Sequence, residues 1–202
     1  MIKVGIIDDH SVLRLGLRHV LALDKELQVV AESDSGSDAA RFFAEGKIDV
    51  LLLDIRMPGV DGLTALREAL SANKDAKIIM LTTSEVEEDI YRALKCGAAG
   101  YLLKSAPPAE MINAVKKVAS GGRYVPDTIE RVFEARSAQP DLSPRELEVL
   151  KLMSKGLSNP EIGDIVGIAP ASVKTHLLHV FEKLGVADRT EAATAAMSRG
   201  II

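Results

Sequence analysis

The sequence has a single cysteine, Cys96, among its 202 residues. One cysteine cannot form an internal disulfide, which argues against a disulfide-stabilised secreted domain and favours a reducing compartment. No apolar run approaches the roughly 20 residues that a membrane-spanning helix needs. The segment Met1–Val4 leads directly into a strand pattern, so we expect no signal peptide and no association with a membrane. These absences predict a cytoplasmic protein.

An excess of basic residues is also missing. The formal net charge is −4, and residues 142–202 contain seven Lys or Arg against seven Asp or Glu. Residues 1–120 contain 15 basic residues against 18 acidic ones. Neither half therefore has the basic excess of a strong non-specific nucleic-acid binder. The length allows one large domain or two small ones, and the apolar fraction of 47% is ordinary for a globular protein.

The first 120 residues alternate strand-like apolar runs with helical patterns. We expect strands over residues 3–7, 28–31, 50–53, 77–81 and 100–103. We expect helices over residues 10–23, 37–44, 63–70, 86–96 and 108–119. This alternation predicts βαβ units and an α/β doubly wound, five-stranded parallel sheet. The flavodoxin-like strand order 2-1-3-4-5 places strands one and three side by side.

Acidic residues follow two of these strands where they end. Asp8 and Asp9 come after the first strand, and Asp54 comes after the third. In the expected strand order the three carboxylates converge at one edge of the sheet. They repel one another unless a hard divalent cation holds them, and Mg²⁺ is the cation that fits best.

Two further polar side chains face the same crevice. Thr82 follows the fourth strand, and Lys104 follows the fifth. An amine and a hydroxyl opposite a metal-bound carboxylate form a site for a tetrahedral anion attached to that carboxylate. This is the layout that Asp54 needs to attack a phosphoryl group, with charge shared by Mg²⁺ and Lys104. The alternative is that these residues are helix caps and a strand end, but five such residues at the ends of four strands argue against coincidence.

Four motifs in this order resemble the receiver domain of two-component response regulators. They are DDH at 8–10, DIRMPGVDG at 54–62, LTTS at 81–84 and GYLLK at 100–104. The resemblance spans residues 1–120. It implies that Asp54 is the phosphoacceptor. It implies also that Asp9, Asp54 and the Arg56 backbone carbonyl bind Mg²⁺, while Asp8 binds it through a water.

The same resemblance assigns roles to four residues after the fourth strand and along the fifth. It implies that Lys104 pairs with the phosphoryl group, and that Thr82 and Tyr101 move together as the switch. Thr83 is larger than the small residue common at its position, so we expect it to restrict water access and slow self-dephosphorylation. A cognate histidine kinase is the implied source of the phosphoryl group.

The second half of the chain has a different pattern. Residues 121–141 mix Gly, Pro, Ser and charged residues, which is typical of a linker, and only 128–135 has a helical pattern. Residues 142–202 contain four helical segments joined by short turns, which predict a small all-α four-helix domain. We expect capping boxes at Ser143 with Glu146 and at Asp188 with Glu191. The second and third helices form a helix-turn-helix pair.

The third helix of this domain, residues 170–184, separates two faces. Val173, Leu177, Val180 and Leu184 share one face at helical spacing and are predicted to be core. The face outside the core has short or cationic residues near its N-terminal end, which suits a DNA major groove. The alternative, an ordinary solvated face, is equally compatible with the spacing. The candidate DNA contacts are Ala171, Ser172, Lys174, Thr175, His176 and Leu178.

The stretch from LSPRELEVLKLMSKGLSNPEIG to KLGVADRTEA resembles the LuxR-type helix-turn-helix effector domain of NarL/FixJ response regulators. The resemblance covers residues 142–202. It implies that Lys174, Thr175 and Leu178 face base edges or phosphates, and that the last helix contributes to dimerisation. Leu178 departs from the polar residues common there and can make only apolar contacts, for instance with a thymine methyl.

The sequence thus predicts a DNA-binding response regulator rather than an enzyme. We expect that a histidine kinase phosphorylates Asp54, that the protein then forms a homodimer, and that the dimer binds double-stranded promoter DNA. One alternative is a receiver-containing transcription factor that works without phosphorylation. Another is a Mg²⁺-dependent aspartyl-phosphate phosphatase, which needs an acid two residues after Asp54, where this chain has Arg56.

Overall fold

A computed structural model describes residues 1–83 and 86–202 of the chain. Within the described residues the fold divides into two compact units, 1–83 with 89–133 and 86–88 with 134–202. Ser84, the last residue of the LTTS motif, lies outside the described residues. In the described part of the chain, no helix combines the length and the apolar character needed to cross a membrane.

The first unit is built on a five-stranded parallel sheet, as the sequence predicted. Its strands are β1 (Ile2–Ile7), β2 (Leu27–Ser33), β3 (Val50–Asp54), β4 (Ile78–Thr82) and β5 (Gly100–Leu103). Their order is β2-β1-β3-β4-β5, and each neighbouring pair is parallel. Every residue of β3 and of β4 is buried, which explains their continuous apolar runs.

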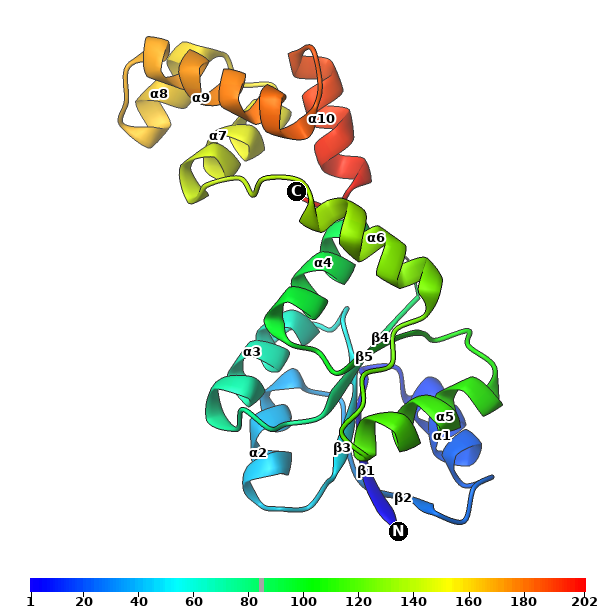
Figure 1. Cartoon of the computed structure of the whole chain (residues 1–202). Helices are drawn as coiled ribbons and strands as arrows, with labels where there is room; N and C mark the ends of the chain where they lie inside the picture. The colour runs from blue at the N-terminus through cyan, green and yellow to red at the C-terminus, as the bar shows by residue number, and fades with distance from the viewer. Residues whose placement is uncertain (84–85) are drawn as a thin grey trace. The chain divides into compact units, whose positions relative to one another are not determined.

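Helices cover both faces of this sheet (Figure 1). One face packs against α1 (Ser11–Leu21) and α5 (Pro108–Ala119). The other packs against α2 (Ala39–Ala44), α3 (Gly62–Ala72) and α4 (Glu87–Cys96). The expected helix over 37–44 is shorter than predicted, because its first turn is the 3₁₀ segment η1 (Gly36–Asp38). The Ser33 hydroxyl donates to the Asp38 carboxylate at 2.7 Å, and this contact stabilises the turn.

The predicted linker, residues 121–141, contains more structure than its composition indicated. The Tyr101 N–H donates to the Tyr124 carbonyl at 3.0 Å, so residue 124 continues the hydrogen bonding at the edge of β5. Next comes α6 (Asp127–Ser137), whose Ile129 is only 1% exposed and packs in the core of the first unit. Phe133 of α6 lies 6.1 Å from the Tyr91 ring of α4, measured between ring centroids. The first part of the segment is therefore integral to the first unit.

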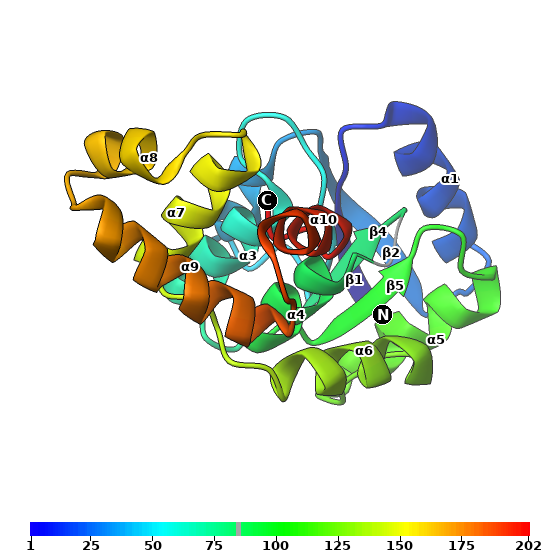
Figure 2. The same cartoon turned by 90° about the horizontal axis from the view of Figure 1, so that it is seen from above.

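The second unit is a small helical bundle. Its main helices are α7 (Pro144–Ser154), α8 (Asn159–Val166), α9 (Pro170–Leu184) and α10 (Arg189–Ser198). They enclose a separate apolar core that includes Val149, Ile162, Val180 and Ala196. In the turned view of Figure 2, α10 is seen end-on while α9 runs across the view, so these two helices cross steeply.

The predicted capping boxes have different outcomes. At the start of α7 the box is complete: the Ser143 side chain accepts from the Glu146 N–H, and Glu146 accepts from the Ser143 N–H. At α10 the Asp188 side chain caps the helix, but the Glu191 carboxylate accepts from the Ala187 N–H instead of the Asp188 N–H. The second box was therefore wrong in its reciprocal half, since Glu191 reaches one residue further back.

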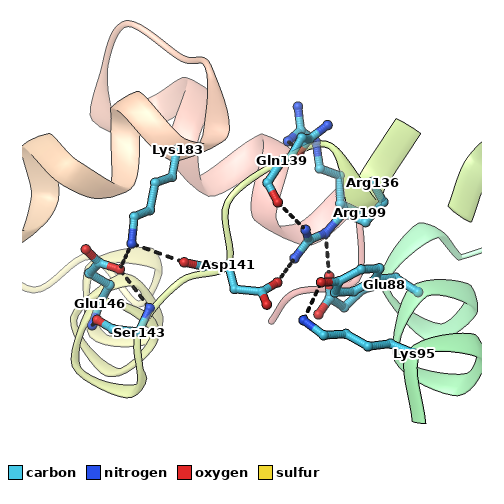
Figure 3. A network of polar contacts seen from close by, with 10 residues as sticks. Glu88, Lys95, Arg136, Gln139, Asp141, Ser143, Glu146, Lys183 and Arg199 are labelled. Carbon is cyan, nitrogen blue, oxygen red and sulfur yellow. Dashed lines mark hydrogen bonds and ion pairs between the residues drawn. The ribbon is translucent and has the colours of Figure 1, made fainter. Parts of the chain in front are cut away.

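A network of polar contacts connects the end of α6 with α7 and α9 inside the second unit (Figure 3). The Lys183 ammonium lies 2.7 Å from the Glu146 carboxylate and donates to the Asp141 carbonyl at 3.1 Å. The Arg136 guanidinium donates to the Asp141 carboxylate at 3.1 Å. Burial favours a higher pKa for Glu146, but Lys183 and the Ser143 hydrogen bonds outweigh it and lower the pKa of this carboxyl.

Candidate functional site

The predicted convergence of acids at the carboxyl edge of the sheet is present. Asp54 is the last residue of β3, and Asp8 follows β1, its neighbour in the sheet. Ligand atoms of Asp8, Asp9, His10 and Asp54 all lie within 4.8 Å of one another. His10 was not predicted to belong to this site. The available signal was its place directly after the two acids in the DDH motif.

Lys104 joins the acids of β1 and β3, as its position after β5 predicted. Its ammonium lies 2.7 Å from the Asp54 Oδ2 atom and 2.8 Å from the Asp8 Oδ2 atom. The Lys104 side chain is 6% exposed, and Asp8 and Asp54 are 0% and 2% exposed. A buried cation thus bridges two buried carboxylates, which compensates part of their desolvation.

The surroundings of Asp54 disfavour its charged form. Burial raises the pKa of the Asp54 carboxyl and the negative charge of Asp8 acts in the same direction, while Lys104 opposes both. The Arg56 N–H donates to the Asp54 Oδ1 atom at 3.3 Å and supplies a second favourable contact. A further positive charge next to Asp54 would therefore stabilise its ionised carboxylate.

The donor set fits a hard divalent cation. Asp8 Oδ2, Asp9 Oδ1 and Asp54 Oδ2 are buried and accept no hydrogen bond within the described residues, apart from the ionic contacts of Lys104 and His10. Carboxylate oxygens grouped in this way are the ligands that Mg²⁺ prefers. Asp8, Asp9 and Asp54 would hold the ion. Its positive charge would then offset the hydration that these carboxylate oxygens lose in the pocket.

The loop after Asp54 is shaped by a close approach between two backbone segments. The Gly62 N–H donates to the Ile55 carbonyl at 3.0 Å, which closes the loop at the start of α3. A Cβ atom at Gly62 would lie 2.0 Å from the Asp54 carbonyl oxygen. Only glycine fits at this position. Asp61 then caps α3 by accepting from the Thr64 N–H at 2.7 Å.

The predicted switch residues lie on β4 and β5 or directly after them. Thr82 is 1% exposed and Tyr101 is fully buried, whereas Thr83 is exposed. The Lys104 N–H donates to the Thr82 carbonyl at 2.7 Å, so the ends of the two strands are held together at the pocket. The proposed movement of Thr82 with Tyr101, and the effect of Thr83 on water access, stay predictions.

One contact beside Asp54 had no signal in the sequence. The Arg56 guanidinium lies 2.5 Å from the carboxylate of Asp89 in the first turn of α4. Arg56 was predicted to act only through its backbone carbonyl. The pair joins residues 33 positions apart, so no local pattern could reveal it.

In the second unit α9 separates its two faces as predicted. Val173, Leu177, Val180 and Leu184 are buried in the core. The candidate contact residues lie outside it: Ala171, Ser172, Lys174, Thr175 and Leu178 are exposed, and His176 is half-buried. Leu178 keeps 51% of its surface exposed, so its side chain is available for an apolar contact.

The turn between α8 and α9 depends on two glycines. Gly167 ends α8 with a φ of 71°, a left-handed conformation that glycine adopts without strain. A Cβ atom at Gly163 would lie 2.6 Å from the Ile168 carbonyl oxygen, so the turn packs directly on the backbone of α8. Pro170 then begins α9, with no side-chain cap from Ala169. The turn therefore holds the start of α9 close to α8 and leaves the candidate contact face exposed.

Comparison with known proteins agrees with both halves of the fold. Residues 4–116 match the response regulator receiver domain, and residues 140–196 match the luxR family of bacterial regulatory proteins. The chain is 34% identical to the response regulator GacA of Pseudomonas aeruginosa, with 100% of this chain and 98% of GacA covered.

Two solved structures are similar to nearly the whole chain. ChrA, the response regulator of a heme-sensing two-component system, is 41% identical with a TM-score of 0.59, over 100% of this chain and 98% of ChrA. RcsB from Salmonella enterica serovar Typhimurium, bound to a promoter in the presence of the phosphomimetic BeF₃⁻, is 26% identical with a TM-score of 0.73, over 98% of each chain. The chain therefore belongs to the NarL/FixJ family of response regulators, with an N-terminal receiver domain and a C-terminal luxR-family DNA-binding domain.

Proposed function

We propose that Asp54 accepts a phosphoryl group from a histidine kinase and that phosphorylation promotes dimerisation and control of target promoters. The observation that carries this proposal is the contact of the buried Lys104 ammonium with both Asp8 and Asp54, at 2.8 and 2.7 Å. The Lys104 ammonium, which pairs with the Asp54 carboxylate, would also be within reach of the oxygens of a phosphoryl group attached to Asp54. RcsB, which is similar over 98% of this chain, has been solved bound to a promoter in the presence of a phosphomimetic.

The transfer itself is a displacement at phosphorus. An Asp54 carboxylate oxygen forms the new O–P bond, and the bond between phosphorus and the donor breaks, so the electron pair leaves with the donor group. Lys104 then moves its ion pair from the Asp54 carboxylate to the phosphoryl oxygens. Asp9, Asp54, the Arg56 carbonyl and, through water, Asp8 would hold Mg²⁺, which would supply charge neutralisation for the phosphoryl group when bound. The chain itself needs no further catalytic group, which favours a phosphorylated regulator over a turnover enzyme.

The experiment incubates the whole protein with acetyl phosphate and Mg²⁺ and follows its intact mass. The wild type should gain one phosphoryl group, and chelation of Mg²⁺ should abolish the gain. Asp54→Asn should not gain it, whereas Asp75→Asn, which changes an exposed acid between α3 and β4, should behave as wild type. Undiminished labelling of Asp54→Asn would show that the phosphoacceptor is a different residue.

A second experiment tests the output with the same phosphorylated protein. Light scattering should show more dimer after phosphorylation, and promoter fragments should be bound more tightly. Thr82→Ala should still be phosphorylated but dimerise less, if Thr82 transmits the change. Equal dimerisation and equal DNA binding with and without acetyl phosphate would favour the rival function, a transcription factor that works without phosphorylation.

A further inference from the structure

Arg56 makes two contacts, one with Asp54 in the pocket and one with Asp89 of α4. Its backbone N–H donates to the Asp54 Oδ1 atom at 3.3 Å. Its guanidinium donates to the Asp89 Oδ2 atom at 2.5 Å. One residue therefore joins the carboxylate at the end of β3 to the first turn of α4, a helix that begins 33 residues after Asp54.

The burial of the two partners is unequal. The Asp89 side chain is 9% exposed, whereas the Arg56 side chain is 63% exposed. A carboxylate buried to this extent depends on a charged donor, because it has lost most of its contact with water. A long, exposed arginine has many alternative rotamers, so the buried acid is the partner that fixes its position. Asp89 thus orders the arginine, rather than the reverse.

The backbone of the same loop is constrained at its other end. Gly62 donates to the Ile55 carbonyl, and its lack of a Cβ atom allows contact with the Asp54 carbonyl. Arg56 lies in this loop, directly after Ile55, and its backbone carbonyl is the one expected to face the metal. Its N–H is fixed by Asp54 and its side chain is fixed by Asp89. With its N–H and its side chain both held, the Cα atom of Arg56 is fixed, and so is the position of the carbonyl carbon bonded to it.

We propose that Asp89 is a positioning residue for the metal site and acts through the Arg56 guanidinium. The ion pair holds the Arg56 backbone in place, so that its carbonyl is available to Mg²⁺ before any ion binds. Loss of the pair should therefore weaken Mg²⁺ binding, and with it the rate of phosphorylation at subsaturating Mg²⁺. This inference rests on the proposed function, since it assumes that the pocket binds Mg²⁺.

Electrostatics alone predicts a different pattern, and the difference makes the test sharp. Removing the negative charge of Asp89 should weaken the binding of a cation nearby, while removing the positive charge of Arg56 should strengthen it. Positioning predicts that both substitutions weaken it. The decisive variant is therefore Arg56→Gln, for which the two explanations give opposite signs.

The experiment measures the Mg²⁺ dissociation constant of the whole protein by calorimetric titration, without any phosphodonor. Arg56→Gln and Asp89→Asn should each raise it by about 3- to 10-fold, at or below the range typical of groups that orient metal ligands. The double variant should be no weaker than the worse single variant, because the two residues act through one contact. Arg56→Lys, which keeps the charge, should recover part of the affinity.

The control is a second ion pair of the same unit, Arg18 with Glu32, at 3.4 Å between α1 and β2. Glu32→Gln should leave the dissociation constant unchanged. Tighter or unchanged Mg²⁺ binding by Arg56→Gln would overturn the inference. Because the Arg56 side chain is exposed, this variant should fold even if Asp89→Asn does not. Failure of the wild type to bind Mg²⁺ at all would instead overturn the proposed function.

Discussion

At the scale of single residues, the pocket depends on the lack of a Cβ atom at Gly62. Gly62 lies so close to Asp54 that a methyl group would overlap the Asp54 carbonyl, at 2.0 Å. Gly62→Ala should therefore destabilise the first unit by about 1–3 kcal/mol or more, because the loop must shift to relieve the overlap. The same shift should slow phosphorylation of Asp54. Calorimetric unfolding and labelling with acetyl phosphate measure the two effects.

The matched control for this prediction is Gly16→Ala. Gly16 lies within α1, and a Cβ atom there would meet nothing within 4 Å. Alanine is a better helix former than glycine, so this variant should gain roughly 0.5–1 kcal/mol. A Gly62→Ala variant as stable as the wild type would show that the loop relaxes without cost.

The residues of the pocket were largely predictable from the sequence, and one of its interactions was not. Asp8, Asp54 and Lys104 were found because parallel strands place their carboxyl ends at one edge, so position along the chain determines position in space. The Arg56 pair with Asp89 was missed because it depends on the rotamer of a long side chain and on where α4 begins. Neither property has a local sequence pattern.

At the scale of elements, the start of α7 makes its own contribution to stability, and that contribution depends on pH. Lys183 and Ser143 hold the pKa of Glu146 below its ordinary value of 4.5 against the effect of burial. A lowered acid pKa means that the stabilisation is present above the ordinary value and is lost as the pH falls through the folded-state value. Glu146→Gln should cost about 1–2 kcal/mol at pH 7, from loss of the charged contact with Lys183, since glutamine can still complete the capping box.

The difference between wild type and Glu146→Gln should shrink below pH 4.5, and calorimetric unfolding of the second unit at several pH values measures it. Glu148→Gln is the control, since among the described residues this exposed side chain pairs only with Arg145 in the adjoining turn of the same helix. Equal stability loss at pH 7 and at pH 3 would assign the role of Glu146 to shape rather than charge.

The helix α6 shows where composition misleads. Its segment reads as a linker because charged and turn-forming residues surround a few apolar ones, yet those few are placed at helical spacing and pack in the core. Ile129→Ala should destabilise the first unit by about 2–4 kcal/mol, as expected for a buried isoleucine. Val12→Ala, at a position 83% exposed, should change the stability little. Equal effects of the two substitutions in calorimetry would place α6 outside the cooperative core.

At the scale of the whole molecule, charge limits what a single DNA-binding domain achieves. Residues 142–202 contain seven basic and seven acidic residues, and the structure ties up part of the basic set. Lys183 pairs with Glu146, and Arg189 donates to the carbonyls of Met153 and Leu157. Lys174 is left as the exposed lysine in the first half of α9. Attraction to phosphates by one domain is therefore small, so a dimer, whose second domain docks at high effective concentration, should bind much more tightly.

The salt dependence of binding measures this directly. Each neutralised phosphate contributes about −0.9 to the slope of log K against log salt concentration. Leu178→Lys should therefore steepen the slope by about one unit per bound domain and strengthen binding with little regard to sequence, while Lys174→Ala should make the slope shallower by a similar amount. Lys151→Ala is the control, because Lys151 lies beside Met197 and Ile202 at the α7–α10 side of the bundle.

The titration uses the phosphorylated and unphosphorylated whole protein on one promoter fragment at several salt concentrations. Phosphorylation should roughly double the slope, because two domains then bind as a unit, and half-sites about 10 base pairs apart should be preferred if the domains are related by a two-fold axis. If Leu178→Lys leaves the slope unchanged, position 178 does not approach the DNA, and the exposed face of α9 is an ordinary solvated surface. If both forms of the wild type give the same slope and affinity, the receiver regulates a step other than DNA binding.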